Sequence, residues 1–148
     1  MFEKIVVGTD GSAESEKAIR AACVLASKFG SQIHLVHTPQ PKTVAFAMGA
    51  VAGYRTATSM PSIEEVEQAS KKIVDTAKEL AAQCNQSIAD VHVERGEPAE
   101  QIIACVESCG ADLIVMGRRG LGGINSLVQG STSQRVNHLA KCACMTVV

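Results

Sequence analysis

The sequence predicts an α/β fold: an open, twisted, parallel sheet of five strands with helices on both faces. Short apolar runs rich in Val and Ile alternate with longer segments whose apolar residues recur every three or four positions. The first pattern is typical of buried strands and the second of amphipathic helices. Regular alternation favours right-handed crossovers, which produce a parallel sheet. The 148 residues show no internal repeat and no linker, so we expect a single domain over residues 1–148.

The first half of the chain carries clear boundary signals for its helices. Gly30 follows a helical pattern at the position of a C-cap glycine. Ser62 and Glu65 have the spacing of a capping box, in which each side chain satisfies a free backbone donor of the other residue. The expected elements are a strand over 4–8, a helix ending at Phe29, a strand over 32–37 and a helix from Ser62 to Cys84.

The second half continues the alternation. The alternating pattern around Val91 predicts an edge or near-edge strand, and Pro98 suits the first turn of a helix. The expected elements are a strand over 88–94, a helix from Pro98 to Gly110, a strand over 112–117, a helix from about Ser131 to Lys141 and a final strand over 145–148. This pattern gives five strands and four helices.

Residues 38–61 interrupt the alternation of strands and helices, because they form a long connection in which no helix or strand is clearly predicted. The segment contains three prolines, only two charged residues and an apolar stretch over 44–54. It could be a loop with a short helix packed on its own domain. Alternatively, it could be a lid or a segment that contacts a partner, because exposed apolar stretches commonly mark interaction sites.

Composition excludes several classes of function. Aromatic residues make up 3% with no Trp, and the formal net charge is −1, which argues against a nucleic-acid-binding surface. No apolar run reaches the roughly 18 residues of a membrane span. The first four residues lack the features of a signal peptide, so we expect a cytoplasmic protein.

The cysteines and histidines show no recognisable metal or catalytic pattern. The sequence has six cysteines but no Cys-x-x-Cys, and a chain of this size does not need disulfides. The pairs Cys105/Cys109 and Cys142/Cys144 could in principle hold a metal, but small buried hydrophobes are the simpler interpretation, so we expect no metal site. No histidine has a recognisable nucleophile partner, and we expect no catalytic residue.

Glycine-rich segments after two strands suggest an anion site. Ligands of open parallel sheets bind outside the carboxyl ends of the strands, where residues 8–12 and 117–131 are expected. Glycines allow close backbone approach, and Gly130 precedes a helix whose free N–H groups favour phosphate. A glycine-rich loop alone is a weak signal, because the glycines could simply serve turns.

The common nucleotide and hydrolase motifs are missing. The chain contains no Gly-Lys-[Ser/Thr], so a P-loop is excluded, and Asn125 occupies the place of the third glycine of the dinucleotide fingerprint. Neither His-Glu-x-x-His nor Gly-x-Ser-x-Gly occurs.

Three ordered motifs resemble the universal stress protein family. Gly117-x2-Gly120-x9-Gly130-Ser131 is similar to the family's nucleotide-binding signature, G-2x-G-9x-G-[S/T]. The segments 4–12 and 112–117 resemble the family's first and fourth strands. The resemblance covers the whole chain and implies a Rossmann-like sheet of order 3-2-1-4-5 and membership of the ATP-binding branch. The tail departs from the family's usual Cys-Pro-Val-Leu-Val-Val, because this chain reads Cys142-Ala-Cys-Met-Thr-Val-Val148.

The resemblance also implies roles for individual residues. Residues after the first two strands would contact adenosine, Met116 would close the pocket with apolar surface, and the glycine loop would approach the ribose and phosphates. The implied binding residues are Gly8, Thr9, Asp10, Thr38, Met116, Gly117, Arg119, Gly120, Gly130, Ser131 and Thr132. Asp10 could instead be a turn or helix-cap residue, and Arg118 and Arg119 could be ordinary surface residues.

Three function classes remain open. The first is a stress-response or regulatory module that binds ATP, with Mg²⁺ bridging the phosphates because the loop carries little charge. The second is a slow ATPase or phosphotransferase, for which the sequence offers no convincing base. The third is a nucleotide-independent dimeric interaction protein. We expect a homodimer joined through residues 145–148, whose apolar edge carries no charge or Pro, and a regulatory protein partner of unknown identity.

Overall fold

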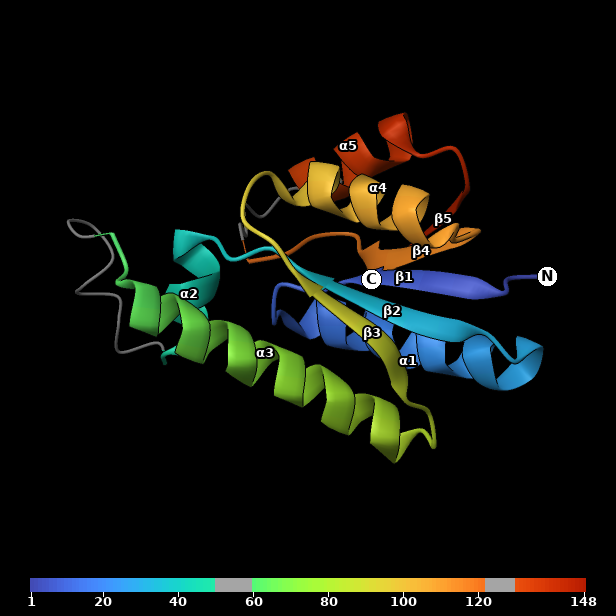
Figure 1. Ribbon diagram of the computed structural model, residues 1–148, viewed down its shortest axis with the longest axis horizontal. Helices are drawn as coiled ribbons and strands as arrows, with labels where there is room; N and C mark the ends of the chain where they lie inside the picture. The colour runs from blue at the N-terminus through green and yellow to red at the C-terminus, as the bar shows by residue number, and fades with distance from the viewer. Residues whose placement is uncertain (50–59, 122–129) are drawn as a thin grey trace.

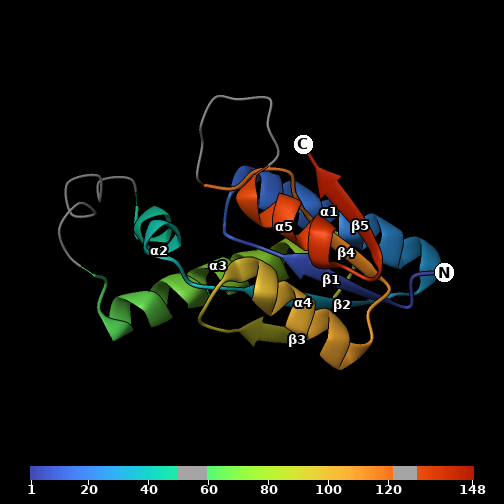
Figure 2. The same ribbon diagram turned by 90° about the horizontal axis from the view of Figure 1, so that it is seen from above.

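The computed structural model describes residues 1–49, 60–121 and 130–148 and shows an open, fully parallel sheet. The strand order is β3-β2-β1-β4-β5, which confirms the predicted fold class and order (Figure 1). The five strands are β1 (Lys4–Gly8), β2 (Gln32–His37), β3 (Ile88–Val93), β4 (Leu113–Gly117) and β5 (Ala143–Val147). β3 and β5 form the two edges of the sheet (Figure 2).

Helices cover both faces of the sheet. α1 (Ala13–Phe29) and α3 (Ile63–Gln83) pack on one face, and α4 (Pro98–Cys109) and α5 (Ser131–Leu139) pack on the other (Figure 1). Each face has its own apolar core, the first including Ile19 and Leu35 and the second including Ile114 and Val136. Strand residues alternate between the two cores because successive side chains point to opposite faces.

The predicted helix boundaries are confirmed where the capping residues were visible in the sequence. Ser62 accepts the N–H of Glu65 at 3.1 Å, and Glu65 in turn accepts the N–H of Ser62 at 2.8 Å. Gly30 and Gly110 end α1 and α4 in the left-handed conformation, with φ of 71° and 68°. The final strand begins at Ala143, two residues earlier than predicted.

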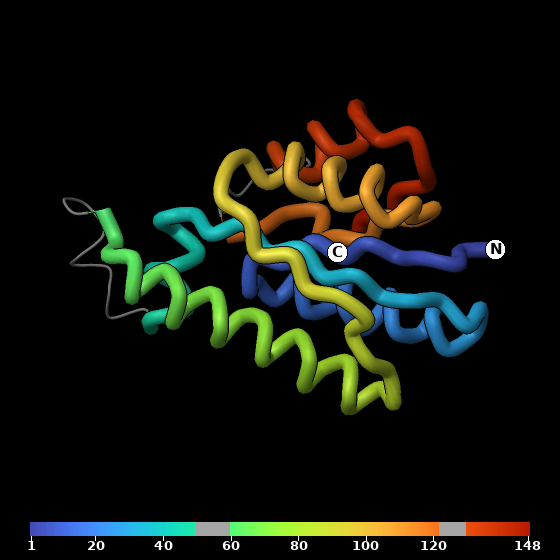
Figure 3. The backbone as a smooth tube through the Cα atoms, in the orientation of Figure 1, coloured from blue at the N-terminus to red at the C-terminus, as the bar shows by residue number. Residues whose placement is uncertain are grey.

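The prediction of four helices is wrong, because a fifth helix lies in the connection that had no firm element. α2 (Pro41–Ala47) starts at Pro41 and packs on α3 through Val44 and Ala47, which contact Ala69 and Ile73. The short-helix interpretation is therefore confirmed for this part (Figure 3). The rest of the predicted apolar stretch, over 50–59, lies outside the described residues.

Within the described part of the chain, no helix combines the length and the apolar character needed to cross a bilayer.

Candidate functional site

A cavity of about 360 Å³ lies at the carboxyl ends of β1, β2 and β4. This edge of the sheet includes the point between β1 and β4 where the strand order reverses, which is where open α/β sheets bind ligands. The volume falls within the range of small-molecule sites. The structure brings all the residues implied by the family resemblance together in its lining: Gly8, Thr9, Asp10, Thr38, Met116, Gly117, Arg119, Gly120, Gly130, Ser131 and Thr132.

The carboxylate of Asp10 joins the loop after β1 to the loop after β4. One oxygen accepts the N–H of Ser12 at 2.9 Å, and the other accepts the N–H of Leu121 at 3.0 Å. A Cβ at Gly120 would lie 2.1 Å from Asp10 Oδ2, so only glycine leaves room for this carboxylate. Asp10 therefore has a turn role, as one of the two sequence interpretations expected, and it also faces the cavity.

Packing alone accounts for the glycine at Gly117. A Cβ there would lie 2.8 Å from the carbonyl oxygen of Arg119 and 2.8 Å from Cβ of Glu14 in α1. The loop after β4 therefore turns tightly against the first turn of α1. This geometry places the backbone of Gly117 in the cavity wall.

The N-terminus of α5 is open toward the cavity. Its N-cap, Gly130, has no side chain that could accept a hydrogen bond from the first turn, and Ser131 and Thr132 line the cavity. The first N–H groups of a helix lack partners within the helix and carry its positive dipole end. The N–H of Gly130 and the hydroxyl of Ser133 donate to the carbonyl of Arg118, at 2.8 and 2.7 Å, and hold the helix start in place. This arrangement is suited to an anion such as phosphate.

Two further polar atoms of the cavity wall have no hydrogen-bond partner among the described residues. They are Oγ1 of Thr38, after β2, and Nε of Arg118, after β4, and both atoms are buried. Buried polar atoms without partners are rare in folded proteins and call for a ligand, ion or water. Both residues line the cavity, so the unsatisfied groups belong to the wall that a ligand would contact.

The peptide groups of Thr9 are already engaged within the protein. Its N–H donates to the carbonyl of Val36 at 2.9 Å, and its carbonyl lies 3.0 Å from Nδ1 of His37. Because a carbonyl only accepts, His37 must carry its proton on Nδ1. Burial lowers the pKa of His37, so the imidazole is neutral near pH 7. His37 is 1% exposed and supports the loop from beneath.

Sequence reasoning missed the contribution of α2 to the cavity. Gln40, Lys42 and Thr43 line it because α2 lies beyond the carboxyl end of β2 (Figure 1). Among the described lining residues, Lys42, Arg118 and Arg119 are the positive charges and Asp10 is the negative one. Pro41 at a helix start was the available signal, but seven residues are too few to show helical periodicity.

The fold and the cavity define the class of protein: an open, doubly wound α/β protein with a small-molecule cavity at the topological switch point. The chain belongs to the universal stress protein family, because the family model described as "Universal stress protein family" matches residues 1–148.

Similar proteins agree with this assignment. The chain is 32% identical over 148 residues to universal stress protein YxiE of Bacillus subtilis, with 99% of each chain covered. It is 32% identical over 151 residues to the universal stress protein in the QAH/OAS sulfhydrylase 3'region of Thermus aquaticus, again with 99% of each covered.

Two solved structures share the fold. A universal stress protein in complex with cAMP has a TM-score of 0.71 and 20% identity, covering 99% of this chain and 97% of that one. The universal stress protein from Archaeoglobus fulgidus in complex with dAMP has a TM-score of 0.69 and 21% identity, covering 98% and 97%.

Proposed function

We propose that the cavity binds an adenine nucleotide, with ATP as the working ligand and Mg²⁺ bridging its phosphates. The observation that carries this proposal is the uncapped start of α5, which opens into the same cavity as the unpartnered atoms of Thr38 and Arg118. Helix N–H groups favour phosphate, and the two side chains offer polar contacts to the rest of a nucleotide. The similar structures that hold cAMP and dAMP support the choice of an adenine ligand.

We propose that two groups of residues in the cavity wall contact different parts of the nucleotide. We assign the adenosine end to the residues that follow β1 and β2, namely Gly8, Thr9, Asp10 and Thr38, with Met116 supplying apolar surface. We assign the ribose and phosphates to the other end of the cavity, formed by Gly117, Arg119, Gly120, Gly130, Ser131 and Thr132. Lys42 adds a positive charge to the wall, although α2 lies outside the family signature.

The residues of the cavity fit a phosphate-bound Mg²⁺ better than a metal held by protein alone. Mg²⁺ prefers oxygen ligands and commonly uses substrate phosphates with one or two protein groups. Asp10 is the sole carboxylate among the described lining residues, and its oxygens already accept two N–H groups. The hydroxyls of Ser131 and Thr132 would offer oxygen ligands at the phosphate end of the cavity, and the ion would neutralise phosphate charge.

We propose a stress-response or regulatory module that holds the nucleotide rather than one that turns it over rapidly. Phosphoryl transfer to water needs a group that orients the water beside the terminal phosphate. The described lining contains no histidine, and the carboxylate of Asp10 is engaged in the loop. Slow ATP hydrolysis is the alternative activity, and a nucleotide-independent dimer is the alternative without a ligand.

We further propose that residues 1–148 form one cytoplasmic domain that assembles into a homodimer and acts on a regulatory protein partner. All six cysteines are free, which suits a reducing compartment. β5 lies at an edge of the sheet, and Met145 and Val148 are 37% and 67% exposed. An unpaired apolar edge can pair with the same strand of a second copy around a two-fold axis.

The nucleotide proposal is tested by denaturing the purified protein and identifying released small molecules by anion-exchange chromatography. We expect an adenine nucleotide, up to one per chain. Calorimetric titration of the emptied protein with ATP should then show tighter binding with Mg²⁺ than without it. A protein that releases no nucleotide and binds no ATP would contradict the proposal, and equal affinities in both conditions would contradict the metal.

A further inference from the structure

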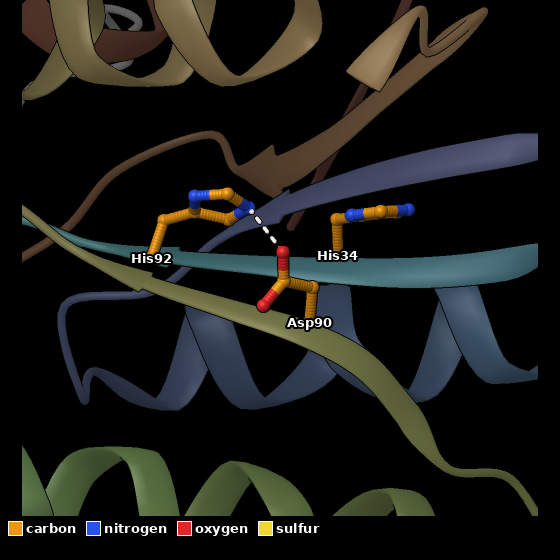
Figure 4. Close-up of side chains that lie close together, drawn as sticks. All are labelled: His34, Asp90 and His92. Carbon is orange, nitrogen blue, oxygen red and sulfur yellow. Dashed lines mark ion pairs between the residues drawn. The ribbon is translucent and has the colours of Figure 1, made fainter. Parts of the chain in front are cut away.

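Three side chains with metal-binding atoms meet on β2 and β3, outside the residues that line the cavity. One ring nitrogen each of His34 and His92 and one carboxylate oxygen of Asp90 lie within 4.8 Å of one another. Figure 4 shows the three side chains on one side of the two strands, away from α1 and α3. We propose that His34, Asp90 and His92 form a binding site for a divalent transition metal ion, with Zn²⁺ the ion that best fits these ligands.

A register shift in the sheet creates this cluster. β2 and β3 pair Ile33 with Ile88, but the next pair is His34 with Asp90, so one residue of β3 is passed over. Without the shift, Asp90 would pair with Leu35, whose side chain faces α1 and α3. The shift therefore turns Asp90 and His92 toward the face of His34, because opposite faces alternate along a strand.

His34 is buried in a way that hydrogen bonding does not explain. The residue is 8% exposed, and neither ring nitrogen has a hydrogen-bond partner in the described part of the chain. Nε2 of His92 lies 3.2 Å from a carboxylate oxygen of Asp90 but lacks the alignment of a hydrogen bond. Buried polar atoms without partners destabilise a fold, and an ion is one of the recognised reasons for finding them. A bound metal would accept the free lone pair of the His34 ring.

The cluster offers one ligand atom from each of its three side chains. An imidazole binds a metal through the lone pair of a ring nitrogen, and a carboxylate binds it through an oxygen. The nearby Cys105 is not counted as a ligand, because its thiol is not among the atoms that lie within 4.8 Å of one another. The site thus has three protein ligands and leaves a further position for water.

The donor set selects the class of ion. Two imidazoles and one carboxylate suit Zn²⁺ and its neighbours among the transition metals, whereas Mg²⁺ and Ca²⁺ require mostly oxygen ligands. Nitrogen and oxygen ligands of tetrahedral Zn²⁺ lie about 3.3 Å apart, given bonds of about 2.0–2.1 Å. The contact of 3.2 Å between His92 and Asp90 already has this spacing.

Closure of the site needs a rotation of side chains. The rings of His34 and His92 lie 6.3 Å apart between centroids, with planes 26° from parallel. One ring must therefore turn for both to point at the same ion. The side chains of His92 and Asp90 are 28% and 59% exposed, so they have room to turn, and an ion can enter from solvent.

The proposal is tested by titrating metal-free protein with Zn²⁺ and following the imidazole ¹⁵N signals of all four histidines by NMR. We expect the signals of His34 and His92 to shift together at one Zn²⁺ per chain. His92→Ala and Asp90→Asn should weaken this binding by more than about 100-fold, because even changes outside the ligand shell cost 10–100-fold. His138→Ala removes an exposed histidine of α5 and serves as the matched control, with unchanged affinity.

The imidazole signals separate this site from binding by cysteines. Zn²⁺ bound only to thiols would leave the His34 and His92 signals in place, and that result would overturn the proposal. Equal affinity in the parent and in His92→Ala would also overturn it. Circular dichroism confirms that both variants fold, and their affinity for ATP should equal that of the parent, because neither residue lines the cavity.

Discussion

Replacing Gly120 with Ala should break the link between the two loops of the cavity. The added Cβ would lie 2.1 Å from Oδ2 of Asp10, so the carboxylate must retreat by at least about 1 Å to reach an ordinary contact distance. The same oxygen accepts the N–H of Leu121 at 3.0 Å, and this hydrogen bond cannot survive the movement. Gly120 does not have a positive φ, so backbone strain plays no part in the effect.

The size of the effect follows from the hydrogen bond that is lost. A hydrogen bond to a charged acceptor contributes about 1.5–3 kcal/mol, and we take about 2 kcal/mol because Asp10 is only half-buried. Replacing Gly with Ala in a permitted conformation stabilises a protein by about 0.4–1 kcal/mol, because it reduces the conformational entropy of the unfolded chain. Gly120→Ala should therefore lower the free energy of unfolding by about 1–1.5 kcal/mol, obtained from these two terms.

A double-mutant cycle isolates the contact. In an Asp10→Ala background the carboxylate is absent, so Gly120→Ala should be neutral or stabilising by up to about 1 kcal/mol. Urea unfolding of the four nucleotide-free proteins gives the free energies, and unchanged m-values show that the unfolded states are comparable. If Gly120→Ala costs the same in both backgrounds, the proposed contact between Asp10 and residue 120 is refuted.

Three further predictions concern the cavity wall, the sheet edge and the buried histidine. Thr38→Val removes an unpartnered buried hydroxyl, so it should stabilise the empty protein by up to about 1 kcal/mol in urea unfolding but weaken ATP binding about fivefold in calorimetry. Thr146→Pro should yield monomers in light scattering. The carbonyl of Val147 accepts the N–H of Arg118, so Val147 faces β4 and the N–H of Thr146, the preceding residue, faces the open edge of the sheet. A folded dimer of unchanged affinity would show that the interface lies elsewhere. Burial lowers the pKa of His37 in the folded protein, so the unfolded chain binds the proton first as the pH falls below about 6.5. The free energy of unfolding should therefore decrease below that pH, by up to about 1.4 kcal/mol per pH unit. In urea unfolding across this pH range, the free energy of unfolding should decrease less steeply for His37→Gln than for the parent. Part of the decrease should remain, because burial also lowers the pKa of His34.

Local signals in the sequence were sufficient for most of the secondary structure. The capping pair Ser62 and Glu65 and the glycines Gly30 and Gly110 end or begin helices as predicted, because their effect depends on a few neighbouring residues. The buried strands were predicted correctly, because strands of a sheet covered on both faces are continuous apolar runs. The strand order came from the family resemblance, since periodicity does not determine which strands are neighbours.

The parts that could not be predicted depend on contacts between distant segments. α2 is stabilised by packing of Val44 and Ala47 on α3, which a short sequence pattern does not show. Lys42 enters the cavity wall only because α2 lies at that edge of the sheet. The need for glycine at Gly120 comes from Asp10, which is remote along the chain.

The histidine cluster is a further example of a feature that only the paired sheet reveals. In the sequence, His34 is a polar residue in a mostly apolar strand. Asp90 and His92 belong to a later strand, from which α2 and α3 separate it along the chain. Their meeting depends on a one-residue shift between β2 and β3. Register shifts of this kind leave no reliable local signal, because the passed-over residue differs in backbone geometry rather than in type.

The most direct test of nucleotide binding is an NMR titration of the ¹⁵N-labelled, emptied protein with ATP and Mg²⁺. Binding in the cavity predicts that the largest amide shifts fall on both of its walls, at Gly8–Asp10 after β1 and at Gly130–Thr132 at the start of α5. The surface formed by β3 and the exposed side of α3 should stay unchanged. A spectrum that does not respond to ATP, or shifts concentrated on that surface, would contradict the account.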